Sequence, residues 1–307
     1  MPMREILLAT DFSAPADLAL ARALAVARQQ SAHLTIVFVE TPAEQGASAS
    51  ITPEAEVAAL ELSSLQKELA EYEERELATR VARAAAAGVK ATGVRKVGEP
   101  EETIAEMARE RGAGLIICGT HGRTGVRRFF LGSVAERLSR LAHKNVLVAR
   151  GAAGDGRFHK ILVATDFARA AERALESALR VAAPDAEVHV VNAWTYPVGS
   201  WGLSALGDRT GALGTLRTAL TQAATEQGAK LEAAQNAAGR PVTFRLVHGS
   251  AADVVTELAA AEGFDLVAVG THGHRGLRRI VLGSVAEAII RHAPCSVLIS
   301  HSDSSMD

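Results

Sequence analysis

The chain has 307 residues, of which 48% are hydrophobic, 22% charged and 4% aromatic. This length and composition predict a globular protein of two domains, and the many alanines favour packed helices over an all-β sandwich. The formal net charge of −2 gives no electrostatic support to a nonspecific nucleic-acid surface, which needs an excess of positive charge.

In the first half of the chain, short strands alternate with helices. Continuous runs of valine, isoleucine and leucine predict strands buried on both faces, near 4–10, 33–39, 89–97, 114–118 and 145–149. Helices are expected near 14–30, 54–87, 101–111 and 133–143. The long second helix carries Glu and Arg that predict solvated faces. Its apolar positions, close to helical spacing, are Val57, Leu60, Leu65, Leu69, Tyr72, Leu77 and Val81.

The second half repeats this order. Strands are expected near 159–164, 186–193, 242–247, 265–269 and 296–300, and helices near 167–182, 209–238, 251–262 and 284–292. Ile6–Phe12 returns as Ile161–Phe167, and Gly119–Arg140 matches Gly270–Arg291 at 14 of 22 positions. A repeat of about 150 residues is too long for a solenoid unit and indicates a duplicated domain. Alternating strands and helices predict a doubly wound parallel sheet in each copy.

The repeat also predicts the domain boundaries. We expect domains at residues 1–150 and 158–301, a Gly-rich linker at 151–157 and a disordered polar tail at 302–307. Cys118 and Cys295 lie in apolar runs without a CxxC partner, which predicts buried thiols in a reducing compartment. Apolar stretches are shorter than the roughly 20 residues of a membrane span, and the N-terminus lacks signal-peptide anatomy. We therefore expect a soluble cytoplasmic protein without membrane partners.

Two repeated features follow strand ends, where open parallel sheets bind ligands. Thr10-Asp11 and its copy Thr165-Asp166 follow the first strand of each half, and a glycine loop follows the fourth strand. Each loop ends in Gly-Ser at the start of a helix, and Ser-x-x-Glu predicts a capping box there. A helix N-terminus is a ready anion site, and glycines permit close approach. The alternative is that these residues only turn the chain and cap a helix, but two matched copies favour a ligand.

The loop spacing Gly-x2-Gly-x9-Gly-Ser resembles the ATP-binding signature of the universal stress protein family. With the early Thr-Asp and the order of elements, the resemblance covers nearly the whole chain. It implies, in each domain, a five-stranded parallel sheet of order 3-2-1-4-5 that binds ATP, with Mg or Mn, at its carboxyl edge. It implies that Asp11 and Asp166 contact the ribose hydroxyls and that Val39 and Ala193 form adenine walls. Ala9 and Ala164 stand where many members have proline. The other residues implied around the nucleotide are Thr10, Gly119, Thr120, His121, Gly122, Arg123, Gly132, Ser133 and Val134, and Thr165, Gly270, Thr271, His272, Gly273, Gly283, Ser284 and Val285.

Some loop residues have two readings. The loop arginines either neutralise phosphates or stay solvated, and they are Arg123, Arg127, Arg128, Arg275, Arg278 and Arg279. His121 and His272 either reach a phosphate or a metal-bound water, or pack beside their own turns.

The motifs favour a nucleotide-dependent regulatory module over an efficient enzyme, because the chain has no GxxxxGK[ST], HExxH or GxSxG sequence. A slow ATPase, or autophosphorylation at Ser133 or Ser284, is the alternative. A receiver-like switch at Asp11 and Asp166 is disfavoured, since receivers need a lysine at a strand end and an acidic cluster. The resemblance also implies that the last strands pair the two domains, and a homodimer is a further expectation.

Overall fold

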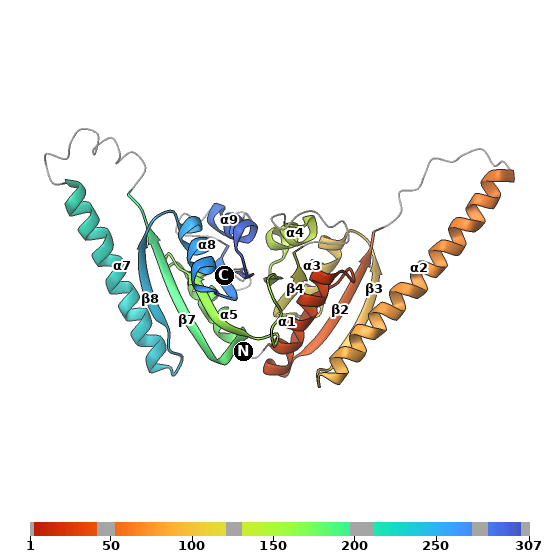
Figure 1. Ribbon diagram of the computed structural model, residues 1–307, viewed down its shortest axis with the longest axis horizontal. Helices are drawn as coiled ribbons and strands as arrows, with labels where there is room; N and C mark the ends of the chain where they lie inside the picture. The colour runs from red at the N-terminus through yellow and green to blue at the C-terminus, as the bar shows by residue number, and fades with distance from the viewer. Residues whose placement is uncertain (1–2, 42–52, 121–130, 197–211, 272–281, 302–307) are drawn as a thin grey trace.

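A computed structural model describes residues 3–41, 53–120, 131–196, 212–271 and 282–301 of the chain (Figure 1). The first half contains β1 (Glu5–Ala9), α1 (Ala14–Gln30), β2 (His33–Glu40), α2 (Pro53–Ala86), β3 (Ala91–Val97), α3 (Pro100–Glu110), β4 (Leu115–Gly119), α4 (Ser133–Leu141) and β5 (Asn145–Ala149). The second contains β6 (Phe158–Ala164), α5 (Arg169–Val181), β7 (Ala182–Trp194), α7 (Ala212–Ala237), β8 (Thr243–His248), α8 (Ala251–Glu262), β9 (Leu266–Gly270), α9 (Ser284–His292) and β10 (Ser296–Ser300). The predicted α/β class, built twice in tandem, is confirmed.

The strands form one ten-stranded sheet in the order β3-β2-β1-β4-β5-β10-β9-β6-β7-β8. Within each half the neighbouring strands are parallel. The halves meet where β10 pairs with β5 in antiparallel register, with Leu298 opposite Leu147. Consequently neither β5 nor β10 is left as an exposed sheet edge.

Helices cover both faces of this sheet, because its strands are apolar on both sides (Figure 1). One core cluster, under α1, α2, α5 and α7, contains Ile6, Leu8, Ile161 and Val163. The other, under α3, α4, α8 and α9, contains Leu7 and Leu162, which face the opposite way on the same strands. Each cluster runs through both halves, so the molecule has continuous cores on either side of one sheet.

Two details differ from the sequence predictions. The second strand of the second half, expected from residue 186, begins at Ala182, directly after α5, with an irregular register between Phe158 and Lys160 on β6. Pro184 favours the early start of the strand, because a proline drives the residue before it, here Ala183, to extended backbone.

The apolar stripe of α2 is the second difference. Leu65, Leu69 and Tyr72 are exposed, whereas Leu77 is buried and Val81 packs on the core. The first part of α2 extends past the end of β3, as Figure 1 shows, so helical spacing alone does not mark burial here. Among the described helices, none has a segment long and apolar enough to span a membrane.

The halves are also joined by polar contacts. Glu136 of α4 pairs with Arg291 of α9 at 3.3 Å, and Arg140 of α4 pairs with Glu287 of α9 at 3.1 Å. Arg150, directly after β5, donates to the carbonyl of Ile290 at 3.0 Å, in the last turn of α9. These contacts join α4 and the end of β5 in the first half to α9 in the second.

Candidate functional site

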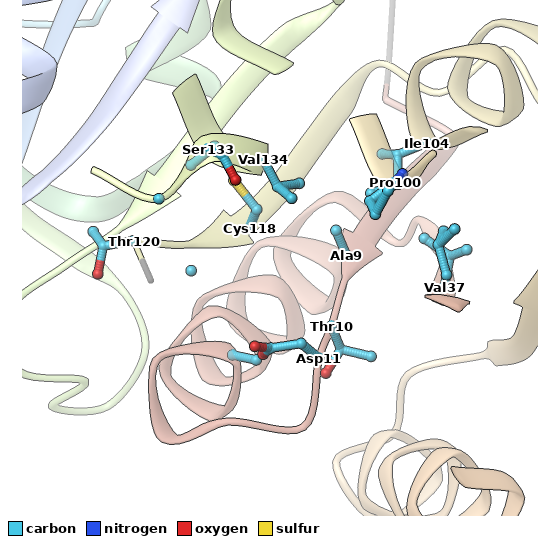
Figure 2. A pocket seen from close by; sticks show the side chains of 15 residues that line it. Ala9, Thr10, Asp11, Val37, Pro100, Ile104, Cys118, Thr120, Ser133 and Val134 are labelled. Carbon is cyan, nitrogen blue, oxygen red and sulfur yellow. The ribbon is translucent and has the colours of Figure 1, made fainter. Parts of the chain in front are cut away.

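The carboxyl edge of the first half surrounds a cavity of about 210 Å³ (Figure 2). Figure 2 shows Thr10 and Asp11 on one side of it and Thr120, Ser133 and Val134 on another. The described residues that line the cavity are Ala9, Thr10, Asp11, Ala16, Val37, Val39, Pro100, Ile104, Cys118, Gly119, Thr120, Gly132, Ser133, Val134 and Ala135. The chain therefore brings the segments after β1 and β4 together at one site.

A tight turn after β1 orients Asp11. The Thr10 amide continues the strand by donating to the carbonyl of Val37 at 2.9 Å, and the Thr10 hydroxyl oxygen accepts from the Phe12 amide at 3.1 Å. Asp11 Oδ1 accepts from the amide of Ser13 at 3.1 Å and from its hydroxyl at 2.6 Å. The carboxylate is thus held by its own turn at the wall of the cavity.

The second wall depends on a close approach at Gly119. A Cβ atom there would lie 2.8 Å from the carbonyl carbon of Pro15 at the start of α1, a backbone atom that can move only together with the helix. The following residue, Thr120, is buried, and its carbonyl accepts from the Gly132 amide at 2.6 Å. This bond joins Thr120, at the end of β4, to Gly132, directly before α4.

The predicted capping box is wrong. The N-cap of α4 is Gly132, with extended backbone (φ −65°, ψ 150°), and Ser133 is the first helical residue. The N-cap of α9 is likewise Gly283, followed by Ser284. The amides of Gly132 and Gly283 donate to the carbonyls of Thr120 and Thr271, and neither N-cap residue makes a side-chain capping hydrogen bond. The Glu136 side chain instead pairs with arginines of α4 and α9.

Several lining residues were not predicted. Pro100 and Ile104 come from α3, and Val37 and Cys118 come from inside strands. Ala16 and Ala135 come from the first turns of α1 and α4. Ile104 could have been found on the apolar face of the helix expected at 101–111. The sequence did not indicate, however, which side of the sheet this helix covers. Val39 lines the cavity as implied, although β2 runs one residue further, to Glu40.

The second half repeats the backbone of this site. The Thr165 amide donates to the carbonyl of Val191 at 2.9 Å, and Asp166 Oδ1 accepts from the Ala168 amide at 3.0 Å. The Gly283 amide donates to the carbonyl of Thr271 at 2.8 Å. At Gly270 a Cβ would lie 2.7 Å from the Ala170 carbonyl. Matching residues stand on the same elements, namely Ala164 on β6, Ala193 on β7 one residue before its end, and Ser284 and Val285 at the start of α9.

Part of the predicted site lies outside the described residues. These residues are His121, Gly122, Arg123, Arg127 and Arg128 in the first half, and His272, Gly273, Arg275, Arg278 and Arg279 in the second.

The described part of the first site offers three kinds of contact. Amides at the start of α4, at Ser133 and Val134, have no partner within the helix and carry positive partial charge, which suits an anion. Asp11 accepts hydrogen bonds, which suits hydroxyl groups. The apolar side chains of Val39 and Ile104 suit a planar ring. Within the described residues, no cluster of His, Cys, Asp and Glu is arranged to hold a metal ion.

Both thiols are buried, as predicted, and burial raises the pKa of Cys118 and of Cys295 to about 12. Near pH 8 the folded thiols are therefore protonated far more completely than in the unfolded chain. We expect iodoacetamide to alkylate the native protein about a thousandfold more slowly than the urea-unfolded protein. Because the thiols ionise in the unfolded chain first, the free energy of unfolding should also fall as the pH rises from 9 towards 12. Fast native alkylation measured by mass would contradict the burial.

Comparisons with known proteins agree on one family. The model of the universal stress protein family matches residues 2–150 and again residues 157–301. A putative universal stress protein of Staphylococcus epidermidis is 45% identical over 69 residues, which are 22% of this chain and 42% of that protein. The match therefore spans less than half the length of that curated relative.

Two solved structures complete the comparison. A universal stress protein from Archaeoglobus fulgidus is similar over 98% of this chain and 99% of its own, with a TM-score of 0.68 and 20% identity, which is a likeness of fold. A universal stress protein solved in complex with cAMP aligns with 48% of this chain and 97% of its own, at 23% identity and a TM-score of 0.35.

Proposed function

Since the chain belongs to the universal stress protein family, with one family match in each half, we propose that it is an ATP-binding regulatory protein of the stress response. Each half would bind one adenine nucleotide at its carboxyl edge. The observation that carries the proposal is the cavity in which Asp11, Gly119 and the first turn of α4 meet. The apolar wall of this cavity suits the base of a nucleotide, the Asp11 carboxylate suits its ribose hydroxyls, and the helix N-terminus suits its phosphates.

In this arrangement the residues have separate tasks. Asp11 accepts hydrogen bonds from the ribose hydroxyls, and Val39 packs against the adenine. The amides of Ser133 and Val134 bind phosphate oxygens, with Mg²⁺ or Mn²⁺ accompanying the phosphates. Asp166, Ala193, Ser284 and Val285 take the same tasks in the second half. Regulation, rather than turnover, is the role proposed.

The test is a titration of the purified protein with ATP by calorimetry. We expect about two nucleotides per chain, and about one after Asp11→Asn or Asp166→Asn, because each change weakens one site about 10- to 100-fold. Asp185→Asn is the matched control, since the Asp185 side chain is 77% exposed on β7. A wild-type protein that binds no adenine nucleotide would contradict the proposal.

A slow ATPase or autophosphorylation is the second candidate, and one observation favours it. Ser133 is the first residue of α4 and lines the cavity rather than capping the helix. Incubation with γ-labelled ATP should label the chain if its hydroxyl is the acceptor, and Ser133→Ala should remove that label. If neither label nor released phosphate rises above background, nucleotide binding is the only activity.

A further inference from the structure

The turn that carries Asp11 contains a residue in an unusual backbone conformation. Phe12 has φ +66°, in the left-handed region that residues with a side chain rarely adopt. Its amide donates to the Thr10 hydroxyl, and the amide of the next residue, Ser13, donates to Asp11 Oδ1. The direction of the Asp11 carboxylate therefore depends on Phe12 staying in this conformation.

Phe38 and Arg80 are two described side chains that contact the Phe12 ring. Phe38 of β2 stacks on it, with ring centroids 4.7 Å apart and planes at 20°. The guanidinium carbon of Arg80 lies 4.7 Å from the ring centroid, close enough for a cation–π contact. Arg80 belongs to α2, and only 4% of it is exposed.

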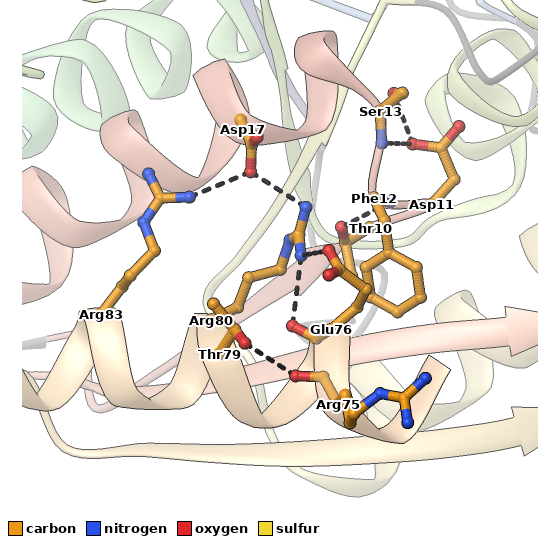
Figure 3. Close-up of polar contacts among 10 residues, drawn as sticks. All are labelled: Thr10, Asp11, Phe12, Ser13, Asp17, Arg75, Glu76, Thr79, Arg80 and Arg83. Carbon is orange, nitrogen blue, oxygen red and sulfur yellow. Dashed lines mark hydrogen bonds and ion pairs between the residues drawn. The ribbon is translucent and has the colours of Figure 1, made fainter. Parts of the chain in front are cut away.

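Arg80 is itself fixed by carboxylates from two helices, as Figure 3 shows. Its Nη2 atom donates to Asp17 Oδ1 of α1 at 3.1 Å, and its Nη1 atom donates to Glu76 Oε2 of α2 at 2.7 Å. A buried guanidinium with these partners has a defined position, so it presents one fixed face to the Phe12 ring.

The second half has the same turn, and among its described residues no cation lies over the corresponding ring. Phe167 has φ +62°, and its ring contacts Phe244 of β8 at 5.9 Å. By strand register, Phe244 of β8 corresponds to Gly93 of β3. Leu77 of α2 packs over Gly93, and the ring of Phe244 packs over Gly228 of α7, so Leu77 corresponds to Gly228. Three residues further along each helix, Arg80 therefore corresponds to Leu231.

We propose that Arg80 is a positioning residue of the first nucleotide site, which clamps the Phe12 ring and so orients Asp11 towards the ribose. This inference rests on the proposed function and goes beyond it, because it makes the two sites unequal. The first site depends on a charged clamp supplied by α2, and the second depends on apolar packing around Phe244. A change in the position of α2 would then alter nucleotide affinity in the first half alone.

The test is Arg80→Leu, which copies the second half, in a protein whose second site is weakened by Asp166→Asn. We expect ATP to bind the first site about tenfold more weakly by calorimetry. Arg83→Leu is the matched control, because Arg83 pairs with the same Asp17 Oδ1 at 3.1 Å but is 47% exposed. It should change affinity less than twofold. Arg80→Lys keeps a cation for the ring and should recover part of the loss.

A ligand without ribose hydroxyls separates positioning from general damage. With 2′,3′-dideoxy-ATP, which offers Asp11 no hydroxyl, Arg80→Leu and its parent should bind equally within about twofold. An equal loss for both ligands, or unchanged ATP affinity in Arg80→Leu, would overturn the inference. If the unsubstituted protein bound no ATP, the proposed function itself would fail instead. Circular dichroism on each variant confirms that the comparison is made between folded proteins.

Discussion

Gly119→Val is expected to lower the free energy of unfolding by about 3 kcal/mol. Valine favours strands, so the loss comes from space alone. A Cβ atom at Gly119 would lie 2.8 Å from the carbonyl carbon and 2.9 Å from the carbonyl oxygen of Pro15. Both are backbone atoms at the start of α1, so α1 must move away from β4. Because the Thr10–Ser13 turn leads into α1, nucleotide binding at the first site should be lost as well. Urea denaturation and ATP titration measure the two effects.

Two further glycines provide the comparison. Gly270→Val should cost a similar amount, because a Cβ there would lie 2.7 Å from the carbonyl carbon and oxygen of Ala170. Gly214→Ala is the control, because Gly214 lies in α7 and a Cβ atom there would meet nothing within 4 Å. Alanine should raise the free energy of unfolding by roughly 0.5 kcal/mol, since it favours helices more than glycine does. If Gly119→Val unfolded at the wild-type urea concentration, the close packing of α1 on β4 would be refuted.

Much of the fold followed from periodicity and repetition. The apolar runs predicted the strands within a few residues, because strands buried on both faces contain few polar residues. The exposed part of α2 did not follow from them. Leu65 and Leu69 have the spacing of a buried face, and only the length of β3 beneath them decides that they are exposed.

The site was predictable where its residues are adjacent in sequence and not where packing assembles it. Thr10-Asp11 and Gly132-Ser133 could be found because the chain carries them twice. Serine and glycine both favour the N-cap, so the bond from the Gly132 amide to the Thr120 carbonyl was needed to choose between them. Arg80 was out of reach, since nothing in the sequence connects it with Phe12, which it contacts in the folded chain.

The composition of the segment that connects the halves did not predict its packing. Residues 151–157 were expected to form a Gly-rich linker, yet they pack on α1. The guanidinium of Arg22 donates to the carbonyl of Ala152 at 2.8 Å and to that of Arg157. It also lies 4.4 Å from the ring centroid of Phe158, the first residue of β6. At Gly156 (φ +84°) a Cβ would lie 2.6 Å from the Ala21 carbonyl oxygen.

Arg22→Met should therefore cost about 3 kcal/mol of unfolding free energy, although methionine fills a similar volume. Only 3% of Arg22 is exposed, and burial lowers the pKa of its guanidinium. Removing the cation takes away its hydrogen bonds to the carbonyls of Ala152 and Arg157, and a hydrogen bond to a charged group contributes about 1.5–3 kcal/mol. Arg28→Met is the matched control on an exposed position of the same helix and should cost at most about 0.5 kcal/mol.

Limited proteolysis distinguishes a loss of linker docking from a general loss of stability. If Arg22 holds residues 151–157 against α1, Arg22→Met should be cut within this segment under conditions where the wild type and Arg28→Met stay intact. The products would be two fragments of nearly equal size. Cutting spread evenly along the chain, or an unchanged urea midpoint, would show that Arg22 does not fix the connection. With the linker docked, α1 of the first half and β6 of the second share one buried cation, so local opening at the junction must disturb both halves.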